Sequence, residues 1–123
     1  MNERLKKVVL VEDWSVMRKF IEEILKKVVG YELYMVLSDI KSVEKYIEGR
    51  TIDLLIMNIP LYREDEALDI TNRIRRSSPS TRIVLTTMTY SDKLYEKAKA
   101  AGANGVWQKE ISETSFIKAC AFL

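Results

Sequence analysis

Five short apolar runs alternate with five segments of helical periodicity along this 123-residue chain. The runs cover residues 7–11, 33–37, 53–57, 82–86 and 105–107. The first and third runs are apolar on both faces, as strands covered by helices on both sides must be. The second run is less uniform, so we expect it at an edge of the sheet. Strands that alternate with helices favour a parallel sheet, because parallel neighbours need crossover connections of about this length.

Apolar stripes and stop signals mark the intervening helices. We expect a first helix whose stripe runs from Trp14 to Val28, a second that ends at Gly49, a third that ends before Pro79, a fourth from Ser91 to Gly102 and a fifth from near Ser112. Right-handed crossovers then favour a doubly wound, three-layer α/β sandwich. The chain has no repeats, linkers or low-complexity stretches, so residues 1–123 read as one domain.

Composition excludes several classes of function. No histidine occurs, which removes histidine metal sites, Ser-His triads and imidazole acid-base catalysis. Cys120 is the only cysteine, so no internal disulfide can form, and we interpret it as a small buried hydrophobic residue rather than a redox site. The net charge is +2, which gives no general reason to bind nucleic acid or an anionic membrane. The N-terminus has no apolar signal stretch, so we expect a cytoplasmic protein.

In a doubly wound sheet the ligand site lies at the carboxyl ends of the strands. The residues just past those ends are therefore the candidates for function. They are Glu12 and Asp13 after the first run, Asn58 after the third, Thr87 after the fourth and Lys109 after the fifth. Taken singly these residues have ordinary explanations, because acidic residues cap helices and threonines favour strands.

Three motifs in this order resemble the receiver domain of bacterial two-component response regulators. They are VLVED at the first strand, RIVLTT at the fourth and AGANGVWQKE at the fifth. The resemblance covers essentially the whole chain and implies a flavodoxin-like, receiver-like sheet of order 2-1-3-4-5 with five helices. Lys109 is followed by Glu110 rather than proline, which resembles the subgroup whose members carry a C-terminal helix-turn-helix DNA-binding domain. A parent protein of that kind would regulate transcription through that output domain.

The resemblance also implies a chemistry for the strand ends. Glu12 and Asp13 match the acid pair that holds Mg²⁺ through oxygen ligands. Thr87 matches the hydroxyl and Lys109 the lysine that stabilise the transferred phosphoryl group. The position of the nucleophilic aspartate, which accepts the phosphoryl group from a phosphohistidine on a sensor kinase, falls on Asn58.

Asn58 is the departure that matters most. A carboxamide has the shape of a carboxylate but is a poor nucleophile and a weaker metal ligand. We therefore expect no catalytic residue, no phosphorylation at the usual position, and Mg²⁺ bound weakly or not at all by Glu12, Asp13 and Asn58. Val106 stands where the family has a switch aromatic, and a β-branched side chain is too stiff to swing. The segment IPLYRE, residues 59–64, replaces the usual Met-Pro followed by glycine, so we expect a rearranged loop.

These features predict a regulatory protein-interaction module that is not an enzyme. Its expected partners are an output domain, a sensor kinase or a second copy bound through the fourth helix, fifth strand and fifth helix, where Leu94, Tyr95 and Lys99 are candidate contacts. One alternative is an active receiver with an engineered Asn58. A remote alternative is a flavodoxin-like cofactor carrier, although the two acids after the first strand would repel a phosphate. We expect Trp14 and Trp107 to pack in the core or against the pocket wall.

Overall fold

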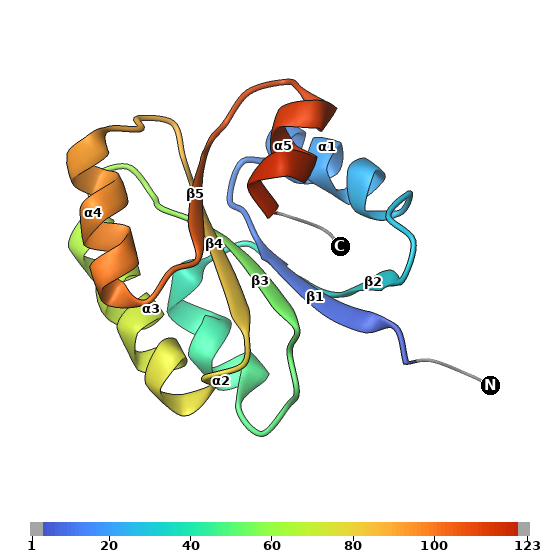
Figure 1. Cartoon of the computed structure of the whole chain (residues 1–123), viewed down its shortest axis with the longest axis horizontal. Helices are drawn as coiled ribbons and strands as arrows, with labels where there is room; N and C mark the ends of the chain where they lie inside the picture. The colour runs from blue at the N-terminus through green and yellow to red at the C-terminus, as the bar shows by residue number, and fades with distance from the viewer. Residues whose placement is uncertain (1–3, 121–123) are drawn as a thin grey trace.

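The computed structural model describes residues 4–120, in which five parallel strands form one sheet of order β2-β1-β3-β4-β5 (Figure 1). The expected domain limits, residues 1 and 123, lie outside the described residues. The strands are β1 (Lys6–Val11), β2 (Tyr31–Leu37), β3 (Leu54–Asn58), β4 (Arg82–Thr87) and β5 (Gly105–Gln108). The helices are α1 (Ser15–Leu25), the 3₁₀ turn η1 (Ile40–Ser42), α2 (Val43–Ile47), α3 (Glu64–Ser77), α4 (Asp92–Ala101) and α5 (Glu113–Cys120).

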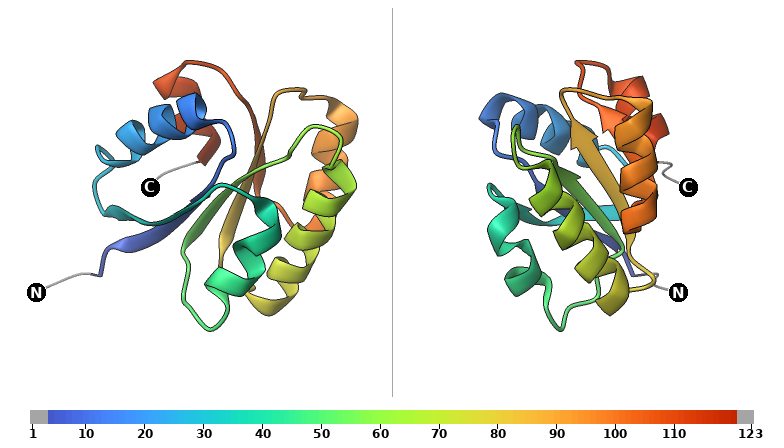
Figure 2. Two further views of the ribbon diagram at one scale, coloured as in Figure 1. Left: turned by 180° about the vertical axis from the view of Figure 1, so that it is seen from behind. Right: turned by 90° about the vertical axis from the view of Figure 1, so that its left-hand side faces the viewer.

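The sheet is the middle of three layers. Helices α1 and α5 cover one face, and α2, α3 and α4 cover the other, as the two further views show (Figure 2). Each face has its own apolar core, because successive strand residues point to opposite sides. In β1, Val9 and Val11 pack towards α2, α3 and α4, whereas Val8 and Leu10 pack towards α1 and α5. The predicted fold class and strand order are confirmed.

The predicted edge position of the second strand is also confirmed. β2 pairs with β1 alone, and each of its residues is at least partly exposed. β1, β3 and β4 are buried along most of their lengths. Their parallel registers place Val11 opposite Met57 and Asn58 opposite Thr86, so the carboxyl ends of these central strands reach the same edge of the sheet.

The first helix is shorter than its apolar stripe suggested. It ends at Leu25, and Val28 lies in the turn that follows. Gly30 then adopts a positive φ of 89° directly before β2, a conformation that costs glycine little. Trp14 precedes the first turn rather than packing into the stripe, and it is 44% exposed. No helix within residues 4–120 is both long and apolar enough to cross a membrane.

Candidate functional site

The structure brings four of the predicted site residues to the walls of one pocket, of about 410 Å³, at the carboxyl edge of the sheet. They are Asp13, Asn58, Thr87 and Lys109. The fifth, Glu12, is fully buried beside them. Each side chain is delivered by the end of a strand or the loop that follows it, which explains how residues far apart in the sequence converge here.

A buried ion pair joins Glu12 to Lys109. The Lys109 ammonium nitrogen lies 2.9 Å from Glu12 Oε1 and 3.0 Å from Oε2. Only the second contact has hydrogen-bond geometry, whereas the first is an ion-pair contact alone. The Trp14 backbone N–H also donates to Oε2, at 3.0 Å. Burial raises the pKa of Glu12 above its ordinary value, and the hydrogen bond from Lys109 opposes that shift. The lysine of the pocket is therefore already committed to an internal partner.

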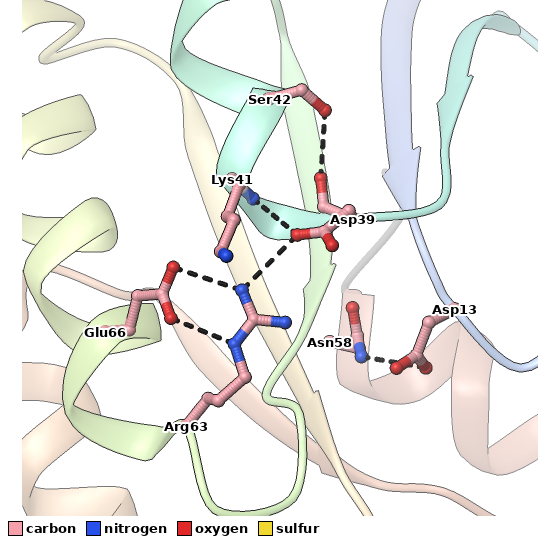
Figure 3. Close-up of polar contacts among 7 residues, drawn as sticks. All are labelled: Asp13, Asp39, Lys41, Ser42, Asn58, Arg63 and Glu66. Atoms are coloured by element: carbon pink, nitrogen blue, oxygen red, sulfur yellow. Dashed lines mark hydrogen bonds and ion pairs between the residues drawn. The ribbon is translucent and has the colours of Figure 1, made fainter.

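Asn58 and Asp13 point toward each other, and both line the pocket (Figure 3). The Asn58 amide nitrogen donates to Asp13 Oδ1 at 3.2 Å, and the Asn58 side chain is almost fully buried at the end of β3. The Asn58 Oδ1 atom is buried and has no hydrogen-bond partner among the described residues. The amide thus places a donor towards Asp13, where an aspartate would place a second negative charge.

This arrangement does not fit a tight divalent metal site. Hard cations such as Mg²⁺ need several oxygen ligands with few competing donors. Glu12 is occupied by Lys109, and Asn58 presents its N–H₂ group to Asp13. That leaves Asp13 as the one carboxylate of the acid pair without a cationic partner among the described residues. No group of three or more acidic, cysteine or histidine side chains suited to a metal occurs within residues 4–120.

The two threonines at the end of β4 differ in their surroundings. Thr87 lines the pocket, and its hydroxyl oxygen accepts from the Thr89 backbone N–H at 3.0 Å. Its carbonyl accepts from the Lys109 backbone N–H at 2.8 Å, which fixes the end of β5 beside β4. Thr86 points to the opposite face of the sheet, where its hydroxyl is buried without a hydrogen-bond partner among the described residues.

The loop after β3 forms one wall of the pocket, and Arg63 anchors its end. The Arg63 guanidinium donates to both Glu66 carboxylate oxygens, at 2.9 and 3.1 Å, and to Asp39 Oδ1 at 3.3 Å (Figure 3). These contacts tie the start of α3 to the loop before α2. Within the loop, Tyr62 adopts a φ of 65°, a left-handed conformation that few residues other than glycine favour. The glycine that the resemblance led us to expect in this loop is absent, and Tyr62 adopts the left-handed conformation instead.

An exposed apolar rim borders the pocket, and of its residues only Trp14 was predicted from the sequence to lie in the core or at the pocket wall. Large apolar side chains on three different loops are exposed beside the polar floor: Trp14, Leu61, Tyr62 and Met88. All four line the pocket, and Tyr62 is 95% exposed. The signal was present in the segments IPLYRE and TTMTY, where apolar residues follow strand ends instead of the polar residues that a solvated loop favours.

The predicted output surface is corrected at one position. Leu94 is only 4% exposed, because Ser91 caps α4 and sets Leu94 one turn later on the face that packs into the core. It is therefore not available to a partner. Tyr95 and Lys99 lie nearer the surface, and the Lys99 ammonium is 5.9 Å from the centre of the Tyr95 ring.

The two residues in the middle of β5 face opposite sides of the sheet. Val106 is half-buried against the α2–α3–α4 core, and Trp107 is buried in the other one. Trp107 packs edge-on against Phe116, with ring centres 5.0 Å apart, and donates to Ser115 Oγ at 2.8 Å. Its predicted packing role is confirmed, and it does not take the position of Val106.

A larger hollow, of about 580 Å³, lies between α2 and α3, away from the strand ends. Two of its arginines have partners within the chain: Arg73 donates to Glu44 at 2.8 Å, and Arg50 donates to the Tyr46 carbonyl at 2.9 Å. The smaller pocket at the sheet edge is the better candidate for function, because its residues converge there from the ends of separate strands.

Comparisons with known proteins identify the family. The family model of the response regulator receiver domain matches residues 8–121. No curated protein in the comparison matches the chain. Among solved structures, a response regulator from Thermotoga maritima is 17% identical, with a TM-score of 0.80 over 93% of this chain and 92% of the other. A LuxR family DNA-binding response regulator from Silicibacter pomeroyi is 23% identical, with a TM-score of 0.78 over 95% and 89%.

A third solved structure is a response regulator protein from Burkholderia pseudomallei with a phosphorylated aspartic acid, a calcium ion and citrate. It is 16% identical, with a TM-score of 0.76 over 94% of this chain and 66% of the other. Identities this low establish the fold alone, and the match to the family model carries the assignment. This chain belongs to the response regulator receiver family.

Proposed function

We propose that this receiver domain regulates its partners through binding and is not phosphorylated at the family's usual position. The observation that carries the proposal is Asn58 at the carboxyl end of β3, buried and hydrogen-bonded through its amide nitrogen to Asp13. A carboxylate oxygen attacks phosphorus because it carries charge and a free lone pair. An amide oxygen is far less nucleophilic, so the step has no competent acceptor at this position.

The contact between Glu12 and Lys109 supports the same interpretation. In an intact site the lysine would stabilise charge on a phosphoryl group. Here its side chain is 5% exposed and held by a buried carboxylate. Releasing it would leave Glu12 as an unpaired buried charge, which is costly. In this proposal Thr87 and Lys109 are retained parts of a pocket whose acceptor has been replaced.

Weak Mg²⁺ binding is part of the proposal. Asp13 alone keeps a carboxylate free of cations, and the Asn58 N–H₂ group competes for one of its oxygens. The calcium ion in the Burkholderia pseudomallei protein accompanies a phosphorylated aspartic acid, a group that Asn58 cannot form by simple phosphotransfer. We assign the domain no enzymatic activity and a cytoplasmic location.

The proposed partners are an output domain, a sensor kinase or a second copy of the chain. The solved LuxR family neighbour is described as a DNA-binding response regulator, which supports a transcriptional output for a parent protein of this chain. The surface over α4, β5 and α5 is the proposed contact region, with Tyr95 and Lys99 as its contacts. The stiff Val106 cannot supply the side-chain rotation that an aromatic residue at this position supplies in the family.

A second candidate is an ordinary phosphoaccepting receiver whose aspartate was changed to Asn58. It is favoured by the convergence of Asp13, Thr87 and Lys109 on one pocket, which an abandoned site has no need to keep. The two candidates differ in whether the rest of the pocket would still support phosphotransfer once an aspartate stood at position 58.

Treatment with acetyl phosphate and Mg²⁺, followed by intact mass measurement, tests the proposal. We expect no gain of a phosphoryl group by the chain as it stands, because the acceptor oxygen is missing. A phosphoryl group mapped to the pocket would overturn the proposal. The matched variant Asn58→Asp separates the two candidates: efficient labelling favours the second, and poor labelling shows that the rest of the pocket has also lost the activity.

A further inference from the structure

The pocket at the sheet edge has the make-up of a ligand site. Its volume of about 410 Å³ falls in the range of sites for small molecules, which combine apolar walls with a few polar groups. Here the walls are the apolar rim of Trp14, Leu61, Tyr62 and Met88. Exposed apolar side chains gathered around a hollow indicate a binding surface more strongly than single exposed ones do.

The charges in the pocket determine what kind of ligand fits. Lys109 is neutralised by Glu12, and Glu64 is paired with Lys97 at 3.2 Å. Asp13 has no cationic partner within residues 4–120, and the hydrogen bond that it accepts at Oδ1 comes from the neutral Asn58 amide. Asp13 is exposed at the pocket wall, and it is therefore the one lining carboxylate without an ion-pair partner among the described residues. An anionic ligand would meet repulsion there, whereas a cation would complete the pair.

The rim favours the same sign of charge. Trp14 and Tyr62 present aromatic rings, which attract cations through their negative faces as well as packing against flat apolar groups. A planar amidinium or guanidinium head also matches a carboxylate with two parallel hydrogen bonds, which a single ammonium cannot do.

We propose that this pocket binds a small organic cation, whose charged head pairs with Asp13 and whose flat apolar body lies against Trp14, Leu61, Tyr62 and Met88. The inference rests on the proposed function, because the pocket is available for a ligand only where no phosphoryl group occupies it. Binding would then supply the input that phosphorylation supplies elsewhere in the family.

Three naphthalene probes of the same shape and different charge test the proposal: 2-naphthamidine, 2-naphthamide and 2-naphthoate. Each is titrated into ¹⁵N-labelled protein while backbone amide resonances are followed. We expect 2-naphthamidine to bind about tenfold more tightly than the neutral amide, and the anion to bind most weakly. The shifted resonances should belong to residues around Asp13, Asn58 and Met88. Equal binding of all three probes, no binding, or shifts elsewhere on the surface would overturn the proposal.

Two substitutions separate the charge from the apolar wall. Asp13→Asn keeps the shape and should remove the preference for the amidine. Tyr62→Gly suits the left-handed backbone at that position and should weaken all three probes, the amidine most, because the ring packs against the naphthalene and also attracts the cation. Tyr46→Ala removes an exposed aromatic side chain on α2, outside the pocket, and should change nothing. A preference that survives Asp13→Asn would contradict the assignment of the head group.

The outcomes also separate this inference from the proposed function. If the amidine does not bind and acetyl phosphate does not label the chain, the proposed cation site is rejected. The proposed phosphorylation-independent function is then still supported. If acetyl phosphate labels the unaltered chain in the pocket, the proposed function is rejected, regardless of how the three probes bind.

Discussion

Asn58 differs from an aspartate by an amide nitrogen in place of one carboxylate oxygen. That nitrogen donates to Asp13 Oδ1 at 3.2 Å and changes a repulsive contact into an attractive one. Two carboxylates at this separation would disfavour ionisation of both, unless a cation lay between them. The hydrogen bond from Asn58 therefore does part of what a metal ion would do between two acids.

The first prediction concerns the stability of the Asn58→Asp variant. Without divalent metal it should unfold with a free energy lower by about 1 kcal/mol, because two carboxylates then face each other. MgCl₂ should restore the loss in the variant through binding to the native state and leave the unaltered chain unchanged. Urea unfolding with and without MgCl₂ measures both, with KCl of equal ionic strength as the control. A clear stabilisation of the unaltered chain by MgCl₂ would contradict weak metal binding.

The second prediction concerns the buried pair. Lys109→Met should lower the free energy of unfolding by about 3 kcal/mol at neutral pH, because it leaves Glu12 as an uncompensated buried charge. The double variant Glu12→Gln/Lys109→Met should recover much of that loss, since the glutamine is neutral and can still accept from the Trp14 N–H. Urea unfolding of the two variants tests the coupling.

The loss of stability caused by Lys109→Met should also depend on pH. Burial raises the folded-state pKa of Glu12, so its ionised form is less favourable in the folded chain than in the unfolded chain. The stability that Glu12 contributes is present below its pKa in the unfolded chain, which is about 4.3. It declines as the pH rises through the higher pKa of Glu12 in the folded chain. Without Lys109 the folded value rises further. The deficit of Lys109→Met should therefore shrink as the pH is lowered towards about 5, and a deficit that is constant with pH would contradict the burial of an ionised Glu12.

At the scale of elements, the turn between α4 and β5 explains the glycine and the asparagine in the AGANG segment. Gly102 ends α4 with a φ of 110°, and a Cβ placed there would lie 2.7 Å from Arg75 Cγ and 2.8 Å from Arg75 Cβ. Arg75 crosses from α3 and donates to the Gly102 carbonyl at 2.9 Å and to Asn104 Oδ1 at 2.8 Å. Asn104 Oδ1 also accepts from the Ile83 N–H at 2.8 Å, which joins the turn to β4.

The third prediction follows from this turn. Gly102→Ala should lower the free energy of unfolding by about 2 kcal/mol, because the substitution combines a left-handed backbone with a clash against Arg75. Gly49→Ala is the matched control, since Gly49 has a φ of 74° but open space where an alanine Cβ would lie. It should cost about half as much, from backbone strain alone. Equal losses for the two variants, measured by thermal or urea unfolding, would show that the contact with Arg75 contributes nothing.

Particular residues show how far the elements could be predicted from the sequence. Continuous apolar runs identified the central strands, because strands that are buried on both faces consist mostly of apolar residues. Ser91 and Gly102 indicated the two ends of α4, because serine and glycine are typical helix-capping residues. Val28 was assigned to α1 because its spacing fits the stripe, yet the helix ends three residues earlier. Periodicity cannot show where a chain turns away to enter the next strand. Tyr62 occupies a left-handed position that its residue type does not signal.

At the scale of the whole molecule, two cores on either side of one sheet make the helices interdependent. Phe116 and Cys120 of α5 pack in the same core as Met17 and Ile21 of α1 and as Trp107 of β5. Cys120 is 1% exposed, and burial raises the pKa of its thiol to about 12. Its thiolate, the reactive form, is therefore scarce in the folded chain at ordinary pH.

The fourth prediction is that Cys120 reports on opening of this core. At pH 8 a thiol reagent such as DTNB should react with the folded chain about a hundredfold or more slowly than with the chain in concentrated urea. The rate should rise with urea along the same curve as the tryptophan fluorescence of unfolding. Complete reaction of the folded chain as fast as of the unfolded one would contradict the burial of α5 in the core.

The location of the site was predictable because the carboxyl ends of parallel strands meet at one edge, which places Asp13, Asn58, Thr87 and Lys109 together. The ion pairs and hydrogen bonds within the site were not predictable from the sequence. Whether Lys109 pairs with Glu12 or reaches into the pocket depends on side-chain rotamers and burial, which residue order does not encode. The apolar rim likewise arises only when three loops are brought to the same edge by the fold.

The spectrum of amide resonances from ¹⁵N-labelled protein, measured before and after addition of acetyl phosphate and Mg²⁺, tests the central claim most directly. It reports a covalent mark, metal binding and a change of shape in one measurement. We predict that the resonances of residues 58, 87, 106 and 109 stay where they are. A new set of resonances for these residues, together with an acyl phosphate on residue 58, would contradict a receiver that works without phosphorylation.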